Sequence, residues 1–270
     1  LPAAMAVVYS AVGFGTLVWL PLAQLLIDRQ GWRGAYQLIG GAQVLIAVIL
    51  MALPWQRLSQ GAPSIVRPAQ SSDTLTDWRL GTAIRHHAFW ALFATYFFTS
   101  LGMFAISAQV VAYLVDAGFS AIRAATAWGM SGVFLVLGML TVSLLDSWLG
   151  RRRSILLSYS LSMAGIVMLW LIGYSPSGWL LFGFLFCFGS TFGSRGPLIS
   201  ATAMSIFRGR RMGEIFGAIL LGAGLGSGLG SWFGGLIHDW TGGYDYVMAF
   251  ALISLAFGMM PFLVVKSLRR

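Results

Sequence analysis

Residues 178–207 read GWLLFGFLFCFGSTFGSRGPLISATAMSIF, a mainly apolar stretch with a single charged residue, Arg195. A transmembrane α-helix needs about 20 such residues, so the stretch is long enough to cross a bilayer. A cation at this depth costs about 3 kcal/mol or more, and it persists where it faces protein, trapped water or an anionic ligand. The stretch therefore predicts a membrane helix with a functional residue near its centre.

The whole chain has the composition of a membrane protein. Of its 270 residues, 58% are hydrophobic and only 9% are charged, which lies outside the usage of soluble domains. The apolar segments are longer than barrel strands and do not alternate, so we predict an all-α membrane protein. Its eight transmembrane helices are expected at residues 4–27, 35–54, 89–115, 124–145, 154–174, 178–206, 215–237 and 246–265.

The basic residues are distributed unequally between the two sides of the predicted membrane protein. The formal net charge of +9 raises the question of a nucleic-acid partner. Alternation of the loops, however, places most of the 17 Lys and Arg residues on one side and only Arg29, Arg33 and Arg123 on the other. Because loops rich in Lys and Arg stay in the cytoplasm, we expect that side and the C-terminus to be cytoplasmic. The positive net charge is then explained by membrane orientation and does not indicate a nucleic-acid partner.

An internal repeat indicates two related helical bundles. Two sets of positions correspond at a constant offset, namely 13–15, 25–28 and Gly31 with 224–226, 236–239 and Gly242. Long-period similarity in a membrane chain indicates duplicated bundles. We interpret residues 1–54 as the last two helices of an N-terminal six-helix bundle and residues 88–270 as a complete C-terminal one. Residues 55–87, which are polar and contain Gly, Pro and Ser, are predicted to form a cytoplasmic linker.

Several motifs carry a family resemblance. The motifs are PLAQ at 21–24, LID at 26–28, GWRGA at 31–35, Phe89-Trp90, Tyr113-Leu114, DAGFS at 116–120, Ala124-Ala125 and SRGP at 194–197. In this order they resemble the fifth to eighth helices and the tenth helix of the major facilitator superfamily of secondary transporters, in the branch of monocarboxylate transporters and oxalate–formate antiporters. The resemblance implies a six-plus-six helical bundle and transport by alternating access, with no cofactor.

The loop after the eighth superfamily helix departs from the usual pattern. Members often carry Asp three residues before Gly-Arg-Arg, whereas here Ser147 stands at that position and Asp146 precedes it. The resemblance still implies a cytoplasmic gate loop that contains Asp146, Gly150, Arg151 and Arg152. Monocarboxylate transporters also use an acidic residue and an Arg in their eighth helix. Residues 124–145 contain neither, so that scheme of proton coupling does not transfer to this chain.

The surroundings of Arg195 predict an interrupted helix. Pro197 has no amide hydrogen to donate to the carbonyl of Gly193, so the helix should bend there. Transporters place substrate sites at interrupted helices near the middle of the membrane. On the same face of this helix lie Thr191 and Thr202, and Thr191 is a second candidate for substrate binding.

Two interpretations of Arg195 remain open at this stage. In the first, the planar guanidinium binds a small organic anion, a mono- or dicarboxylate, with two parallel hydrogen bonds. In the second, Arg195 braces neighbouring helices through their carbonyl groups, or pairs with an acid in helices that would precede Leu1 in a complete duplication. No Asp or Glu lies deep in the eight predicted spans.

Further polar residues are candidates to line the same site: Tyr9 and Tyr96 belong to sets with helical spacing, and Gln109 lies on a face next to that of Tyr96. Tyr9 lies in the first predicted span, and Tyr96 and Gln109 lie in the third. For each of them, a hydrogen bond between helices is an equally good interpretation. The seventh predicted span carries Gly222, Gly226, Gly230 and Gly234 at four-residue intervals. This spacing favours close helix packing over ligand contact, and a smooth glycine face suits helices that rock during transport.

Enzymatic function is not indicated. Ser227 and His238 lie on one predicted helix, about 16 Å apart along its axis, so they cannot form a catalytic pair. No Cys and His residues have the spacing of a metal site. We therefore expect a multi-pass transporter of the cytoplasmic membrane, monomeric in the bilayer, with a proton or a counter-anion as candidate coupled ion. The alternatives are a carrier or exporter of neutral or amphipathic molecules, in which Arg195 is structural, and a membrane sensor that transports nothing.

Overall fold

The described part of the chain is mostly helical. The computed structural model describes residues 2–54, 78–207, 209 and 211–265, with side chains except for residues 2–12, 140 and 142–147. These residues form no β-strand. Their helices are α1 (Pro2–Met51), α3 (Leu80–Ile84), α4 (His87–Asp116), α5 (Ala121–Leu149), α6 (Arg151–Ile172), α7 (Gly178–Phe184), η1 (Leu185–Gly189), α8 (Ser190–Phe192), α9 (Arg195–Ile206), α10 (Met212–Thr241) and α11 (Asp245–Val264).

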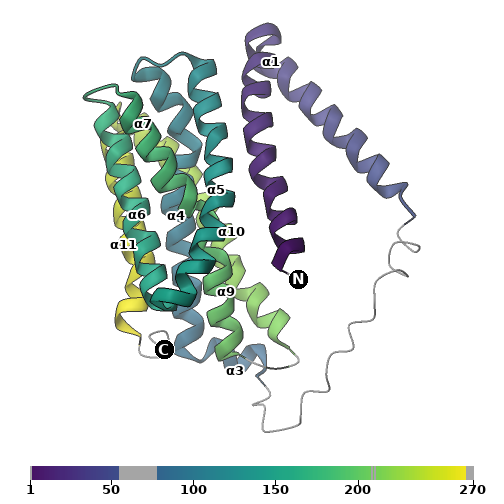
Figure 1. The fold of residues 1–270 in the computed structure, drawn as a ribbon, viewed down its shortest axis with the longest axis vertical. Coiled ribbons are helices and arrows are strands. Elements are labelled where there is room, and N and C mark those ends of the chain that lie inside the picture. The colour runs from purple at the N-terminus through teal and green to yellow at the C-terminus, as the bar shows by residue number, and fades with distance from the viewer. Residues whose placement is uncertain (1, 55–77, 208, 210, 266–270) are drawn as a thin grey trace. The chain divides into compact units, whose positions relative to one another are not determined.

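The chain divides into two compact units. One unit comprises residues 22–75, and the other comprises residues 1–21 together with 76–270. The second unit contains all the helices of the predicted C-terminal bundle (Figure 1). Of the linker predicted at 55–87, residues 55–77 lie outside the described residues. The division into 1–54, 55–87 and 88–270 remains a prediction.

Six helices in the described ranges are long and apolar enough to cross a membrane. Two features explain why six such helices are found where eight spans are predicted. Gly31, with a φ of 70°, divides α1 into two helices that correspond to the first two spans, and only glycine adopts this left-handed conformation readily. The predicted span 178–206 is absent from the six because it is broken into α7, η1, α8 and α9.

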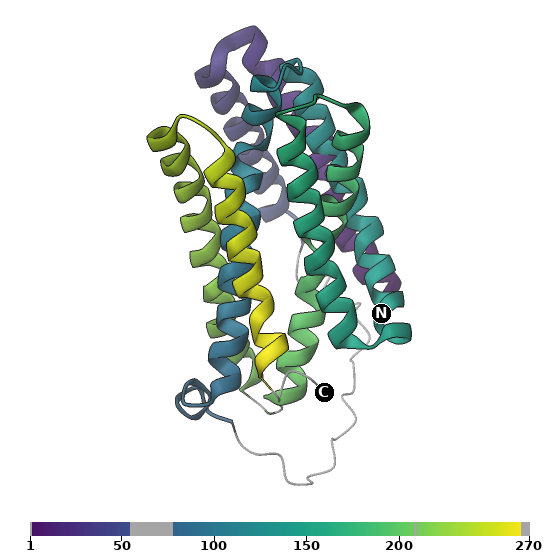
Figure 2. The ribbon, with the colours of Figure 1, turned by 90° about the vertical axis from the view of Figure 1, so that its left-hand side faces the viewer.

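In the second unit, α4 packs against both α10 and α11, and Figure 2 shows these three helices side by side. Glycines allow the close approach of α4 and α10. A β-carbon at any of the four glycines predicted for packing would lie less than 3.0 Å from a carbonyl oxygen of α4; the opposing pairs are Gly222 and Phe93, Gly226 and Phe97, Gly230 and Leu101, and Gly234 and Ala105. Packing is therefore what these glycines provide in this structure.

The segment from Gly178 to Ile206 is interrupted at two places. Residues 185–189 form a π-helical turn, which inserts an extra residue into helical geometry and is frequent at functional sites. The helix then stops at Phe192 and resumes at Arg195. This second interruption lies where a bend is predicted from Pro197, which has no N–H for the Gly193 carbonyl.

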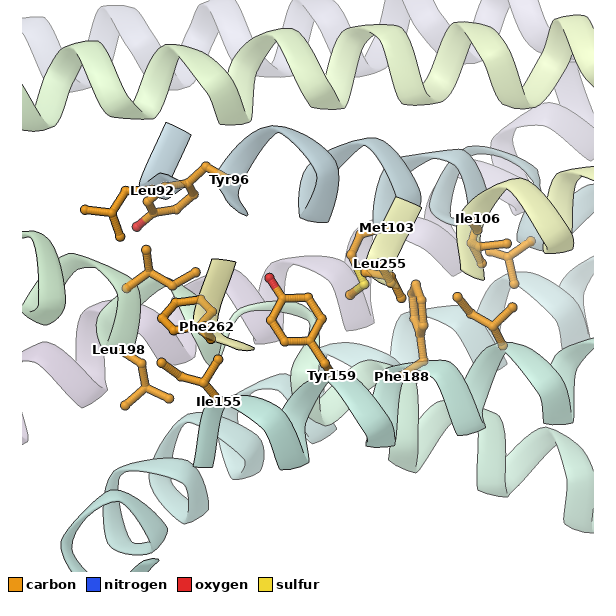
Figure 3. Packing of buried hydrophobic residues seen from close by; sticks show 14 of the residues in the cluster. Leu92, Tyr96, Met103, Ile106, Ile155, Tyr159, Phe188, Leu198, Leu255 and Phe262 are labelled. Carbon is orange, nitrogen blue, oxygen red and sulfur yellow. The ribbon is translucent and has the colours of Figure 1, made fainter. Parts of the chain in front are cut away.

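Side chains from α4, α6, η1 and α11 form the core around the interrupted segment. Figure 3 shows Met103, Leu255, Tyr159 and Phe188 pointing toward one another, and Tyr159 and Phe188 are fully buried. The core is thus built directly beside the start of α9, and it positions the residues described next.

Candidate functional site

Arg195 is the first residue of α9, directly after the interruption, and only 3% of its surface is exposed. The side chain is therefore enclosed by protein and does not point at lipid. Among the buried side chains that the structure describes, it is the one that carries a formal charge at pH 7. Such a cation has lost its hydration, so its contacts decide what it can bind.

The guanidinium contacts three side chains from two neighbouring helices. Its Nη2 donates a hydrogen bond to Oγ of Ser162 in α6 and lies 3.8 Å from Sδ of Met103 in α4. Its Cζ lies 4.5 Å from the ring centroid of Tyr159 in α6, a favourable position for a cation over an aromatic face. Its Nε and Nη1 have no hydrogen-bond partner within the described part of the chain. No described carboxylate is paired with Arg195.

A directed chain of hydrogen bonds continues from Arg195 to the π-helical turn. The Ser162 and Thr191 hydroxyls are 2.5 Å apart, and Oγ1 of Thr191 lies 3.0 Å from the carbonyl oxygens of Cys187 and Phe188. Arg can only donate, and each hydroxyl has one hydrogen to give. The order of donation is therefore fixed: Arg195 to Ser162, Ser162 to Thr191, and Thr191 to the backbone of η1.

A second hydrogen bond fixes the ring on which the guanidinium lies. The hydroxyl of Tyr159 is hydrogen-bonded to Thr99 in α4. On the side of α11, a β-carbon at Gly258 would lie 2.9 Å from Oγ1 of Thr99 and 3.3 Å from the Tyr159 oxygen. Glycine at this position therefore leaves room for the pair.

The structure brings some of the predicted site residues to Arg195 and leaves others away from it. Thr191 joins the cluster through Ser162, and the hydroxyl of Tyr96 donates to the carbonyl of Gly196 at 3.3 Å. Thr202, in contrast, donates to the carbonyl of Leu198 within its own helix. Tyr96 and Thr191 are therefore neighbours of the site.

Gln109 and Tyr9 do not join the Arg195 cluster in the described structure. Gln109 is half-buried and lies against α10, where its Nε2 would be 3.5 Å from a β-carbon placed on Gly235. It lies about 9 Å further along α4 than Met103. The side chain of Tyr9 lies outside the described residues. Substrate contact by Gln109 or Tyr9 stays a prediction.

Comparison with known proteins establishes the family. The family model described as Major Facilitator Superfamily matches residues 1–231. The chain belongs to the major facilitator superfamily. This confirms the resemblance seen in the sequence and identifies a multi-pass membrane protein from a family of transporters, not an enzyme.

Two relatives of this facilitator-superfamily chain are informative. An uncharacterized MFS-type transporter, YcxA, of Bacillus subtilis (strain 168) is 24% identical over 269 residues, which cover 96% of the chain and 64% of that protein. Monocarboxylate transporter 12-B of Danio rerio is 23% identical over 297 residues, which cover 99% of the chain and 62% of that protein. The chain thus spans less than two thirds of the length of either relative.

The loop predicted to act as a gate precedes α6. Gly150 adopts a φ of 79° before the first residue of this helix, Arg151, and this left-handed conformation explains glycine at the position. Arg151 is half-buried and Arg152 is exposed. The side chain of Asp146 lies outside the described residues, so the gate role of this loop remains a prediction.

Sequence reasoning missed three residues that touch the guanidinium: Met103, Tyr159 and Ser162. One signal in the sequence points to α6, because Ser154, Ser158 and Ser162 recur every four residues and lie on one helical face. The signal is weak, since Ser158 satisfies its hydroxyl locally on the carbonyl of Ile155. Met103 has the pattern of an ordinary core residue.

Another polar cluster ties together the helix ends far from the gate loop. The hydroxyl of Tyr244 donates to Asp116 at 3.2 Å, and the indole N–H of Trp170 donates to Asp245 at 2.6 Å. Burial and the neighbouring carboxylate of Asp116 raise the pKa of Tyr244 to about 12. These bonds join the ends of α4, α6 and α11 and do not involve Arg195.

Proposed function

We propose that the protein is a secondary transporter that moves a small organic anion, specifically a monocarboxylate, by alternating access. The observation that carries this proposal is that Arg195 is buried with N–H groups that lack an acceptor among the described residues. The guanidinium is buried, and the N–H groups on Nε and Nη1 have no acceptor within the described part of the chain. A buried donor without a partner costs about 1–3 kcal/mol, and more when it is charged. A carboxylate guest would accept from one of these two nitrogens, which reduces this cost, and would neutralise the charge.

The single buried cation favours one carboxylate over two. Arg195 is the one charged residue among the described buried side chains. A dicarboxylate would bring a second anionic group into a core formed by Met103, Tyr159 and Phe188, where an unpaired charge is strongly unfavourable. The relative from Danio rerio, which is named a monocarboxylate transporter, supports the same substrate class.

The interrupted helix supports a mechanism in which the site opens. Arg195 is almost fully enclosed, so a guest can reach it only when neighbouring helices move apart. The breaks at η1 and between Phe192 and Arg195 provide points at which this helix can bend. The glycine face of α10 provides a surface on which α4 can slide or tilt. In our proposal, rocking of the bundles exposes Arg195 alternately to each side of the membrane, with a proton or a counter-anion as the coupled ion.

The bracing interpretation of Arg195 predicts acceptors of a different kind. An arginine that braces helices through carbonyl groups would donate to the backbone. Within the described part of the chain, the polar contacts of Arg195 are with the side chains of Ser162, Tyr159 and Met103, and none of these is a backbone carbonyl. These contacts leave most of its N–H groups for another acceptor, which supports a binding role.

The proposal is tested with the full-length protein in liposomes. Uptake of labelled mono- and dicarboxylates is compared for wild type, Arg195→Ala, Arg195→Lys and Arg123→Ala. Arg123 is an exposed arginine of α5 and serves as the matched control. We expect kcat/KM for the monocarboxylate to fall about 100-fold in Arg195→Ala and at least about tenfold in Arg195→Lys, which lacks the fork of parallel donors. Arg123→Ala should transport normally.

Each alternative predicts a different result in this assay. Monocarboxylate uptake that is unchanged in Arg195→Ala would reject the anion site. Uptake of neutral or amphipathic solutes that is the same in wild type and Arg195→Ala would identify a carrier of such solutes. Absence of flux for every solute, with the protein folded, would favour the sensor.

A further inference from the structure

The two contacts of Nη2 differ greatly in strength. Ser162 offers a hydroxyl oxygen, whereas Met103 offers a thioether sulfur at 3.8 Å. A thioether is a weak hydrogen-bond acceptor. Met103 is 3% exposed, so it lies against the guanidinium with water excluded. Met103 is therefore the contact of Arg195 that an incoming oxygen acceptor can replace most easily.

The shape of a guanidinium makes Nη2 essential for recognition of a carboxylate. The group has five N–H bonds in one plane, and two parallel N–H bonds occur either on Nε and Nη2 or on Nη1 and Nη2. Each of these edges includes Nη2. A carboxylate that binds through two parallel hydrogen bonds must therefore take one hydrogen of Nη2 from its present contact.

The Ser162 side of the guanidinium is held firmly. Ser162 is itself tied to Thr191, which donates to the backbone of η1. The ring of Tyr159 supports the guanidinium from one face, and Thr99 fixes that ring in turn. Removing Ser162 from Nη2 would disturb this whole chain, whereas moving Met103 would disturb none of it.

The side chain of Met103 is also the one best able to move. Methionine is unbranched, has three rotatable bonds and adapts to irregular spaces. In Figure 3 it points toward Tyr159 and Phe188 from the opposite side, next to Leu255. Its displacement would free the position beside Nη2 that the thioether now occupies.

We propose that Met103 occupies the place of the guest in this conformation: the carboxylate displaces its thioether from Nη2, while Ser162 and Tyr159 keep the guanidinium in position. Met103 and Ser162 both contact Nη2, but Met103 should weaken the binding of the carboxylate and Ser162 should strengthen it. This inference rests on the proposed function for its transport consequences. The geometry around Nη2 can be tested without transport.

The first test builds a carboxylate into the protein. Met103→Glu places an acid of similar length beside Nη2, and Met103→Gln is the matched neutral control. We expect Met103→Glu to have a Tm at least about 3 °C above that of Met103→Gln, and to lose monocarboxylate uptake at least about tenfold because the site is filled from within. In the Arg195→Ala background the difference in Tm should disappear.

The second test uses variants that retain an uncharged core. Met103→Leu removes the weak acceptor at nearly constant volume, so KM for the monocarboxylate should fall about two-fold. Ser162→Ala removes the oxygen that positions Nη2, so KM should rise about tenfold while kcat changes little. Both values come from the uptake assay in liposomes, with Tm measured to show that each variant is folded.

The outcomes separate this inference from the proposed function. Equal Tm values for Met103→Glu and Met103→Gln, or a tenfold rise of KM in Met103→Leu, would overturn the role of Met103. If the Tm difference depends on Arg195 but wild type transports no carboxylate, the geometry stands and the proposed function fails. If Met103→Glu does not fold, the role of Met103 is tested by KM alone, which should fall in Met103→Leu and rise in Ser162→Ala.

Discussion

α10 runs without interruption from Met212 to Thr241, although every fourth residue from 222 to 234 is glycine, whereas the segment from Gly178 to Ile206 is divided into four pieces. A glycine in a helix interior costs about 1 kcal/mol relative to alanine. In α10 this cost is offset by close packing on the backbone of α4. In the interrupted segment, Pro197 removes a hydrogen bond as well, and the helix is interrupted at Gly193. Glycine therefore permits either result, and the partner surface or a nearby proline decides which one occurs.

The largest effect is expected where the glycine face of α10 is filled. Gly226→Leu would force a side chain into the backbone of α4 near Phe97, and overpacking costs about 3 kcal/mol or more at a site that cannot move. We expect loss of folded protein in detergent, measured by size-exclusion chromatography and thermal unfolding. Gly224→Ala is the matched control, because a β-carbon there meets no atom within 4 Å. Equal behaviour of the two variants would contradict the packing role of this face.

A smaller effect is expected when the interrupted helix is repaired. Pro197→Ala restores an N–H that can donate to the carbonyl of Gly193, so the segment should straighten and gain stability. We expect Tm to rise by about 2–4 °C and kcat for uptake to fall about tenfold, because the bend that lets the site open is lost. The comparison with the uninterrupted α10 thus predicts that Tm rises while kcat falls. A fall in both quantities would show that the bend is structural only.

The hydrogen-bond chain that joins Arg195 to the π-helical turn can be cut with little change in volume. Thr191→Val removes the hydroxyl that accepts from Ser162 and donates to η1. Loss of a buried hydrogen bond of this kind costs about 1 kcal/mol, so we expect KM to rise about three- to fivefold. Thr202→Val is the control, since its hydroxyl donates to the carbonyl of Leu198 within α9. An equal effect of the two substitutions would exclude a special role for the chain.

The smallest effect is expected at the helix ends where Tyr244 meets Asp116, a hydrogen bond that does not involve Arg195. The pKa of Tyr244 is raised to about 12 by burial and by Asp116, so its phenol stays protonated where a free tyrosine ionises. The stabilisation from this hydrogen bond is present below pH 10 and is lost as the pH rises through about 12. Asp116→Asn should lower the pKa of Tyr244 toward 10. Absorbance at 295 nm between pH 8 and 13, with Tyr244→Phe as the reference, measures the change, and an unaltered titration would contradict the contribution of Asp116.

The sequence was sufficient for features that stand out from an apolar background. A lone arginine, a proline within a span and a four-residue glycine repeat are each rare enough in membrane helices to predict a buried cation, a bend and a close contact. The contacts of Arg195 were not predictable in the same way. Ser162 and Tyr159 meet it only because α6 has a particular rotation about its axis, and a serine in a helix can satisfy its hydroxyl locally. Gln109 was selected by polarity alone, and it lies further along α4.

The π-helical turn at residues 185–189 also fixes the rotational phase of everything that follows it. One residue more or less in a helix turns the downstream part by about 100° about its axis. If this turn wound as an ordinary α-helix with the same number of residues, Arg195 would therefore swing away from α6 without a change in its identity, whereas deletion of one residue together with the bulge would keep its present phase. The neighbours of this cation are set by a count of residues upstream as much as by its own side chain.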